Sequence, residues 1–99
     1  MQNQNEIQAP NRNLPFGNAI EAAKNGFKVA REGWNEANMF AYIVPAASYP
    51  AKTYAAKSFF GEDSLVPYRA YWALKTTQDD VAMWAPSGSD SLAEDWMIL

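Results

Sequence analysis

The sequence predicts an α+β domain, with an antiparallel sheet of about five strands, one main N-terminal helix and one or two short helices. Three observations favour this class: a helical repeat of apolar residues early in the chain, short strand-like segments bounded by Gly and Pro after it, and short connections between them. A chain of 99 residues can bury one core, with a radius of gyration of roughly 13 Å. It is too short for a deep cleft of its own, so we expect a large ligand site to need a second copy.

The N-terminal part divides into a tail and a helix. Residues 1–13 are polar and lack periodicity, which predicts a mobile polar tail, with a single domain over 14–99. Pro15 suits a first helical turn, and Asn25-Gly26 is typical of a helix end. Between them apolar residues recur with helical spacing at Phe16, Ala19, Ile20, Ala23 and Phe27.

After residue 27 the spacing of the apolar residues changes from that of a helix to that of strands. Strands are expected over 28–31 and 39–44, separated by a turn over 32–36, and Pro45 ends the second because it cannot donate to a ladder. Residues 46–52 are expected to form a loop. A short helix is predicted over 54–60, stopped by Gly61.

The last third is predicted to hold a hairpin, a short helix and a strand. Residues 69–75 alternate, which places Ala70, Trp72 and Leu74 on one face and Trp72 in the core. The segment 76–80 turns the chain, and 81–84 returns as a hairpin partner. Ser87-Gly88-Ser89-Asp90 fits a helix-start signal, and 95–99 closes the domain as a strand.

Composition excludes several classes of function. The chain has 0 His and 0 Cys, which rules out Ser-His-Asp and Cys-His nucleophiles and imidazole or thiolate metal sites. The net charge of −3 is a poor match for duplex DNA. The N-terminus does not resemble a signal peptide, and the apolar runs are far shorter than the ~20 residues of a membrane span. We therefore expect a soluble, intracellular protein that binds neither DNA nor membrane and needs no metal or cofactor.

Acidic pairs and aromatic residues beside turns are the candidate chemistry. The pairs Glu62/Asp63 and Asp79/Asp80 lie in turns, where acids are usually just solvated, whereas Asp95 lies at a helix-to-strand junction. Asp95 could act on a ligand or simply bond backbone amides in a turn.

Two tryptophans, Trp34 and Trp84, each lie at a strand end, where a ring face can stack on a base or instead fill the core. A cation nearby, Arg31 or Arg69, could bind a phosphate. Arg69 could equally belong to a solvated sheet face.

The order of motifs resembles phage and prophage proteins of the second Thoeris anti-defense type, over about residues 14 to 99. The opening blocks are Phe16-Gly17-Asn18-Ala19, Lys28-Val29-Ala30-Arg31-Glu32-Gly33-Trp34-Asn35 and Met39-Phe40-Ala41-Tyr42-Ile43-Val44-Pro45. The closing blocks are Pro67-Tyr68-Arg69-Ala70-Tyr71, Trp84-Ala85-Pro86-Ser87 and Ser89-Asp90-Ser91-Leu92-Ala93-Glu94-Asp95-Trp96.

This resemblance implies a sponge in the cytoplasm of the infected host, which holds the cyclic ADP-ribose isomer made by TIR enzymes without cleaving it. It also implies a homo-oligomer, typically a tetramer, with ligand pockets where subunits meet. Some relatives capture cyclic oligonucleotides as well, and Lys28, Lys57 and Arg69 are candidates for such extra phosphates.

The site residues that the resemblance implies have separate expected roles. Trp34 or Trp84 stacks the adenine with Phe16 beside it, and Arg31 offsets the pyrophosphate charge. Ser89 offers a hydroxyl and nearby helix amides. Asp90 and Asp95 accept ribose or amine protons. Two other functions stay open: a carboxylate-dependent cyclic nucleotide hydrolase, and an inhibitor that binds a defense protein directly.

Overall fold

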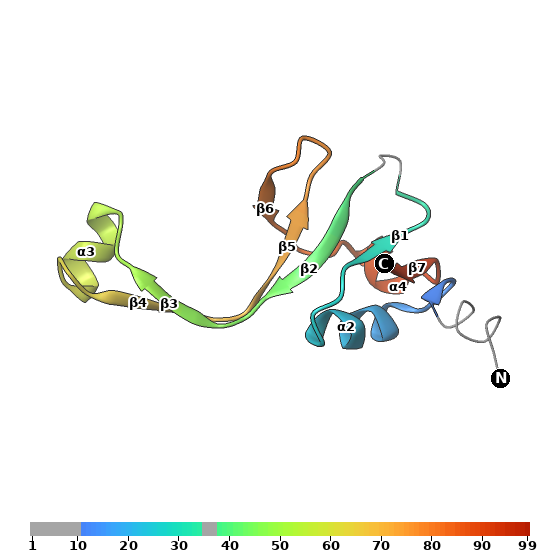
Figure 1. The fold of residues 1–99 in the computed structure, drawn as a ribbon, viewed down its shortest axis with the longest axis horizontal. Helices are drawn as coiled ribbons and strands as arrows, with labels where there is room; N and C mark the ends of the chain where they lie inside the picture. Colours follow the sequence, from blue (N-terminus) through green and yellow to red (C-terminus); the bar gives the residue numbers. More distant parts are fainter. Residues whose placement is uncertain (1–10, 35–37) are drawn as a thin grey trace.

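The computed structural model describes residues 11–34 and 38–99, and it confirms the α+β class (Figure 1). The helices are α2 (Phe16–Lys24), α3 (Tyr54–Phe60) and α4 (Gly88–Leu92). The strands are β1 (Val29–Arg31), β2 (Phe40–Val44), β3 (Ala47–Pro50), β4 (Leu65–Tyr68), β5 (Tyr71–Lys75), β6 (Val81–Met83) and β7 (Trp96–Ile98). Five strands form one antiparallel sheet in the order β6-β5-β2-β1-β7, and β3 and β4 form a separate ribbon.

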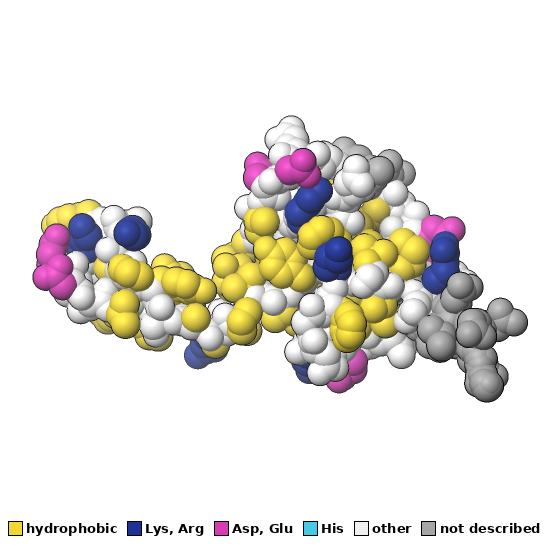
Figure 2. Space-filling view, in the orientation of Figure 1, with side chains coloured by type: hydrophobic (Ala, Val, Ile, Leu, Met, Phe, Trp, Pro, Cys, Tyr) yellow, Lys and Arg dark blue, Asp and Glu magenta, His cyan; other side chains and the backbone are white. Residues whose placement is uncertain are grey.

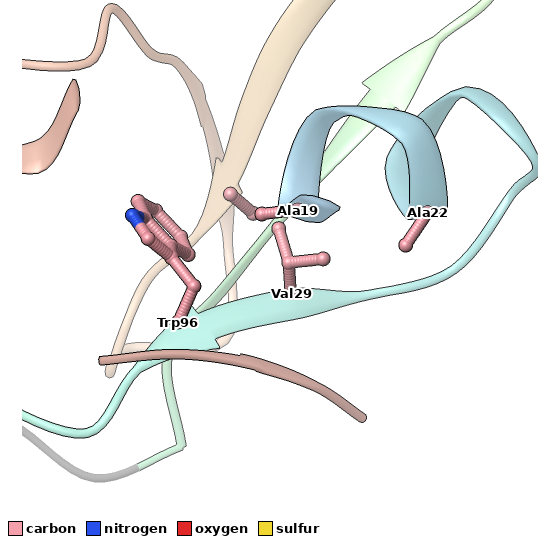
Figure 3. Packing of buried hydrophobic residues seen from close by; sticks show 5 residues of the cluster. Ala19, Ala22, Val29 and Trp96 are labelled. Carbon is pink, nitrogen blue, oxygen red and sulfur yellow. The ribbon is translucent and has the colours of Figure 1, made fainter. Parts of the chain in front are cut away.

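Helix α2 packs on one face of the five-stranded sheet and forms the core with it. Its buried residues are alanines, whose small side chains allow the helix to lie close to the strands, as Figure 3 shows for Ala19 and Ala22 beside Val29 and Trp96. Trp96 is the largest fully buried side chain. The half-buried residues Trp72 and Leu74 of β5 pack against this core, as expected from the alternation.

The predicted ends of α2 are confirmed, with one error. Pro15 is the N-cap, Asn25 is the C-cap, and Gly26 adopts a φ of 94° that favours glycine. Phe27 was expected on the apolar face of the helix, but it is 51% exposed. The helix ends before it, so Phe27 no longer follows the helical repeat.

The largest correction concerns residues 46–52, which were expected to be a loop. Ala47–Pro50 is instead strand β3, and it pairs with β4 from Ala47↔Tyr68 to Pro50↔Leu65. With α3, which was predicted correctly, these strands form an arm that extends away from the sheet (Figure 1). We call residues 47–68 the arm. It lengthens the molecule to 56 Å and raises the radius of gyration to 17.1 Å, above the roughly 13 Å expected of a compact chain.

The C-terminal elements follow the sequence expectation. The hairpin β5–β6 closes through Thr76, whose N–H donates to the carbonyl of Asp80, and α4 begins at the predicted Ser87 cap. Strand β5 begins only at Tyr71, so Arg69 and Ala70 lie outside the strand predicted for them. Ala73 is buried on the sheet face opposite α2.

Some expectations fall outside the described residues. Residues 1–10 of the expected tail and residues 35 and 36 of the expected turn belong to this group. Arg12, at the end of that tail, lies 3.3 Å from Glu32, and Leu14 bridges to Trp96. Within the described part of the chain, no helix combines the length and apolar character needed to cross a membrane.

Candidate functional site

An arginine held by two aspartates lies where β1, α4 and the start of β7 meet. The Nε of Arg31 donates to Asp95 Oδ1 at 2.8 Å, and its Nη1 donates to Asp90 Oδ1 at 2.9 Å. All three side chains are largely buried, with 21% of Arg31, 13% of Asp90 and 30% of Asp95 exposed. We call these three side chains the Arg31 network. It joins residues 59 and 64 positions apart in the chain.

Local structure fixes each member of the network. Ser87 and Asp90 form a reciprocal capping box at the start of α4, which orients the Asp90 carboxylate. The other oxygen of Asp95 accepts from the Gly33 N–H at 2.8 Å, and the Asp95 carbonyl accepts from the Glu32 N–H. A side chain at position 33 would meet Asp95 at 2.7 Å, so glycine is required for this close approach.

The network is charged at neutral pH. The hydrogen bond that Arg31 donates holds the pKa of Asp95 below its usual value, and the bonds that Arg31 donates to Asp95 and, second, to Asp90 raise the pKa of Arg31. Burial works to raise the pKa of Asp90, but hydrogen bonds from Arg31 and Ser87 outweigh it, so this pKa is also lowered. Two carboxylates and one guanidinium therefore persist together, with a net charge of −1.

Five aromatic rings pack behind the network. Trp34 meets Trp84 edge-on with centroids 6.1 Å apart, and it meets Trp96 edge-on at 5.5 Å. Phe16 lies 5.1 Å from Trp96, and Trp72 lies 5.2 Å from Trp84. The indole N–H of Trp96 donates to the Asp90 carbonyl at 2.9 Å, which ties the rings to the Arg31 network. Trp34 and Trp84 are only half-buried, so each keeps an accessible part.

A shallow hollow of about 700 Å³ opens beside the network, and its volume is within the range of small-molecule sites. Arg31 and Trp34 line it, together with several residues that the site prediction did not include. They include three cations, two acidic residues and one aromatic ring, namely Arg12, Lys28, Lys75, Glu32, Asp79 and Phe40. Lys28 Nζ lies 5.1 Å from the centre of the Phe40 ring.

The structure brings the seven predicted site residues into one neighbourhood. Arg31, Trp34, Asp90 and Asp95 are joined by hydrogen bonds, the longest being 3.4 Å from the Trp34 indole to Asp90. Phe16 and Trp84 contact the same ring cluster. Ser89 lies next to Asp90 in α4 and is exposed. Of the seven predicted residues, Arg31 and Trp34 line the hollow and the other five do not. The seven residues are Phe16, Arg31, Trp34, Trp84, Ser89, Asp90 and Asp95.

Other candidate phosphate ligands are scattered. Lys28 lies in the hollow, Lys57 is on the arm and pairs with Glu62 at 3.4 Å, and Arg69 is exposed between the arm and β5. Sequence reasoning did not include Arg12, Lys75 or Phe40 in the site. A signal existed for Phe40 and Lys75, because strand alternation places both on the same sheet face as Lys28, but their proximity depends on the pairing Phe40↔Lys75.

This arrangement suits recognition of an anion that carries a flat ring. The guanidinium has five N–H donors, and described residues accept from two of them. Four cations and two acidic side chains line the hollow, which leaves its lining net positive, and aromatic surface borders it. No three acidic side chains among residues 11–34 and 38–99 converge in a way that could hold a metal ion.

Comparison with known proteins gives two matches. A family model described as Thoeris anti-defense 2-like domain matches residues 14–99. A protein of Bacillus phage SP01 named Thoeris anti-defense 2 is 36% identical over 90 residues, which cover 87% of this chain and 94% of that protein.

Proposed function

The chain belongs to the Thoeris anti-defense 2-like family, and from this membership we propose that it sequesters a cyclic ADP-ribose-type signalling nucleotide in the cytoplasm of the infected host. The family and the phage relative support the coarser role, which is a phage anti-defense function against Thoeris. Sequestration removes the signal, made by TIR enzymes, before it reaches the Thoeris effector. The domain over 14–99 acts as a sponge and not as an enzyme.

The hollow bordered by Arg31 and Trp34 is the observation that carries the proposal. The cyclic ligand has two chemical parts, a pyrophosphate and an adenine ring. Lys28 supplies positive charge for the pyrophosphate. Arg12, Arg31 and Lys75 also pair with acidic side chains, and they add N–H donors around the phosphates. The aromatic surface of Trp34 supplies a stacking partner for the base, which contributes about 1–3 kcal/mol.

The remaining site residues position or support Arg31 and Trp34. Asp90 and Asp95 hold the guanidinium in place, and the partly exposed Asp95 accepts a ribose hydroxyl or an amine proton. Trp84 and Phe16 support Trp34 and its neighbours from behind. A second copy of the chain closes the open side of the hollow and, through the hydroxyl of Ser89 at the edge of α4, extends the pocket between subunits. The assembly is a homo-oligomer, and a tetramer fits the family.

Binding without cleavage is supported by the charge state of the carboxylates. A hydrolase that uses paired carboxylates needs one of them protonated near neutral pH, with a raised pKa. The pKa values of Asp90 and Asp95 are both lowered, so neither is suited to donate a proton.

The test combines thermal unfolding with recovery of the ligand. At 100 times its dissociation constant, the cyclic ADP-ribose isomer should stabilise the fold by about 2.7 kcal/mol, which raises Tm by roughly 10–20 °C for a domain of this size. Chromatography after heat denaturation should return the ligand intact. Linear product and turnover would instead identify a hydrolase. The absence of any Tm shift, with a stable complex with a Thoeris protein, would identify a direct inhibitor.

The breadth of ligands is tested in the same way. The cations Lys28 and Lys75 lie near each other in the hollow and could accept further phosphates. A Tm shift with cyclic oligonucleotides would show that the sponge also takes the signals of related immune systems.

A further inference from the structure

Arg12 lines the hollow although it precedes the part of the chain that the family model matches. That match covers residues 14–99, so family membership assigns no role to Arg12. The backbone nevertheless has a fixed course here. Leu14 exchanges two backbone hydrogen bonds of 3.0 Å with Trp96. Asn13 adopts a left-handed φ of 55°, which asparagine tolerates better than most residues. The bridge and the turn before it therefore hold Arg12 beside the sheet.

Glu32 is the acidic partner of Arg12, and both residues line the hollow. Glu32 follows the last residue of β1, and its N–H donates to the Asp95 carbonyl at 3.0 Å. Among the described residues, Glu32 accepts from one of the five N–H donors of the Arg12 guanidinium, at 3.3 Å. The two side chains are 56% and 57% exposed, so solvent screens their attraction. This ion pair is weak enough to be exchanged.

The other paired cations of the hollow are held more firmly. Lys75 lies 2.7 Å from Asp79 and donates to the Asn38 carbonyl at 2.7 Å, and only 20% of its side chain is exposed. Arg31 is 21% exposed and has two aspartate partners within 2.9 Å. The ion pair of Arg12 is the longest of these, and its cation is the most exposed. Arg12 is therefore the paired cation that changes its partner most easily.

We propose that Arg12 is a specificity-determining residue of the hollow, and that it exchanges Glu32 for a phosphate when a ligand with two linked phosphates binds. The inference rests on the proposed function and deepens it, because it names the feature of the ligand that the hollow recognises. A phosphate can accept two parallel N–H bonds from a guanidinium, whereas Glu32 accepts one. The exchange therefore adds a hydrogen bond to Arg12.

The mixed charge around the hollow makes this exchange selective. Four cations and two acidic side chains line it, and Figure 2 shows basic and acidic side chains close together among hydrophobic ones on one face of the molecule. Among the described residues, no carboxylate lies within ion-pair distance of Lys28, so Lys28 meets one phosphate without losing a partner. A single phosphate leaves the pair of Arg12 and Glu32 in place. A second, linked phosphate reaches Arg12, so the hollow favours pyrophosphate.

The first experiment measures binding of the cyclic ADP-ribose isomer by titration calorimetry. The salt concentration is about 0.15 M, where exposed charges more than about 8 Å apart are screened. Arg12→Gln should raise the dissociation constant about tenfold, and Glu32→Gln should lower it about threefold because it frees the guanidinium. In the Arg12→Gln background, Glu32→Gln should have no further effect, because Glu32 acts only through Arg12.

Lys24 and Glu21 provide the matched controls. They form another exposed ion pair, 3.9 Å long, on α2, and neither of them lines the hollow. Lys24→Gln and Glu21→Gln change the net charge of the chain by the same amounts as the two test substitutions, and they should leave the dissociation constant unchanged. The Tm without ligand should stay within about 2 °C of the wild type for all four single variants, because exposed ion pairs contribute little to stability.

The second experiment uses inorganic pyrophosphate and inorganic phosphate as probes, so it does not depend on the identity of the nucleotide. Binding is followed by the NMR chemical shifts of amides around the hollow. The wild type should bind pyrophosphate at least about fivefold more tightly than phosphate, and Arg12→Gln should bring the two dissociation constants within about twofold of each other.

Three results would overturn the inference: unchanged binding by Arg12→Gln, an effect of Glu32→Gln that is equally large without Arg12, or control substitutions that match the test substitutions. Failure of the sponge is seen separately. A wild type that does not bind the cyclic nucleotide, but prefers pyrophosphate through Arg12, refutes only the proposed function. A chain that binds the nucleotide equally well with and without Arg12 refutes only the inference, and a chain that binds none of the three probes refutes both.

Discussion

Replacing Asp95 by asparagine removes one charge from the Arg31 network with little change in shape. Asp95 accepts two hydrogen bonds of 2.8 Å, one from Arg31 Nε and one from the Gly33 N–H. An asparagine has one carbonyl oxygen, so it keeps one acceptor and turns an N–H donor toward the other donor. A charge-assisted bond contributes about 1.5–3 kcal/mol, and the 30% exposure of Asp95 reduces this through solvent screening. We expect Asp95→Asn to lower the free energy of unfolding by about 1–2 kcal/mol.

Urea unfolding followed by tryptophan fluorescence measures this loss as a lower midpoint at constant slope. Asp79→Asn is the matched control. Asp79 pairs with Lys75 at 2.7 Å but is 82% exposed, and its φ of 63° is one that asparagine tolerates, so its replacement should change stability by less than about 0.5 kcal/mol. If both variants lose the same stability, the network does not hold β1, α4 and β7 together as we infer.

Unfolding of the wild type and of Asp95→Asn over a range of acid pH values tests the sign of the pKa shifts. The pKa values of Asp90 and Asp95 are lowered in the folded state, so their contribution is complete above the ordinary carboxyl value of about 3.9 and is lost as pH falls below it. The contribution of this network to the free energy of unfolding should therefore stay constant between about pH 5 and pH 8. In stronger acid the contribution should fall. Asp95→Asn should show a smaller fall over the same acid range.

Three further substitutions probe the core, the turn and the hollow. Trp96→Phe should cost about 2–4 kcal/mol in urea unfolding, because it leaves a cavity in the core and removes a bond to a backbone carbonyl of α4; a cost below about 1 kcal/mol would place that ring outside the core. Gly33→Ala should destabilise by about 1–2 kcal/mol, since its Cβ collides with a carboxylate of the Arg31 network, whereas Gly17→Ala, with open space around it, should be neutral or stabilise by about 0.5 kcal/mol. If Gly33→Ala and Gly17→Ala changed stability equally, the close approach of Gly33 to Asp95 would be contradicted. Lys28→Gln should weaken binding of the cyclic nucleotide about tenfold in titration calorimetry while Lys57→Gln, on the arm, leaves it unchanged; equal losses would move the ligand out of the hollow.

Local signals explain which parts of the fold the sequence predicted. Helix α2 follows from its apolar repeat and its Pro15 and Gly26 ends, and α4 follows from the Ser87 capping box, because these are interactions between neighbours in the chain. Strand β3 escaped prediction because its identity depends on a partner about twenty residues away. Its sequence Ala-Ser-Tyr-Pro has little strand propensity, and its partner β4 contains Pro67, which cannot donate to a ladder.

The candidate site shows the same division between local and long-range information. Sequence motifs identified Arg31, Asp90 and Asp95 as residues of interest, but their mutual bonding spans about sixty positions and follows only from the pairing of β1 with β7. The expected role of Arg31 as a free phosphate ligand changes as a result, since two of its N–H groups serve the aspartates. Trp96 received no role in the core from its sequence neighbourhood, although the Leu14↔Trp96 bridge and α2 enclose it completely.

The charge state of the Arg31 network is fixed by the network itself, and this bears on the proposed function as a sponge. A sponge gains nothing from a group that changes protonation during binding, whereas an enzyme that moves protons requires one. The chain contains 0 His, and the pKa shifts of Arg31, Asp90 and Asp95 all move away from neutrality. Each interaction in the network strengthens the charged form of its partner, so the guanidinium stays positioned before any ligand arrives. Because the charge is already positioned, less side-chain entropy is lost on binding, and a small binding protein needs this saving to hold its ligand tightly.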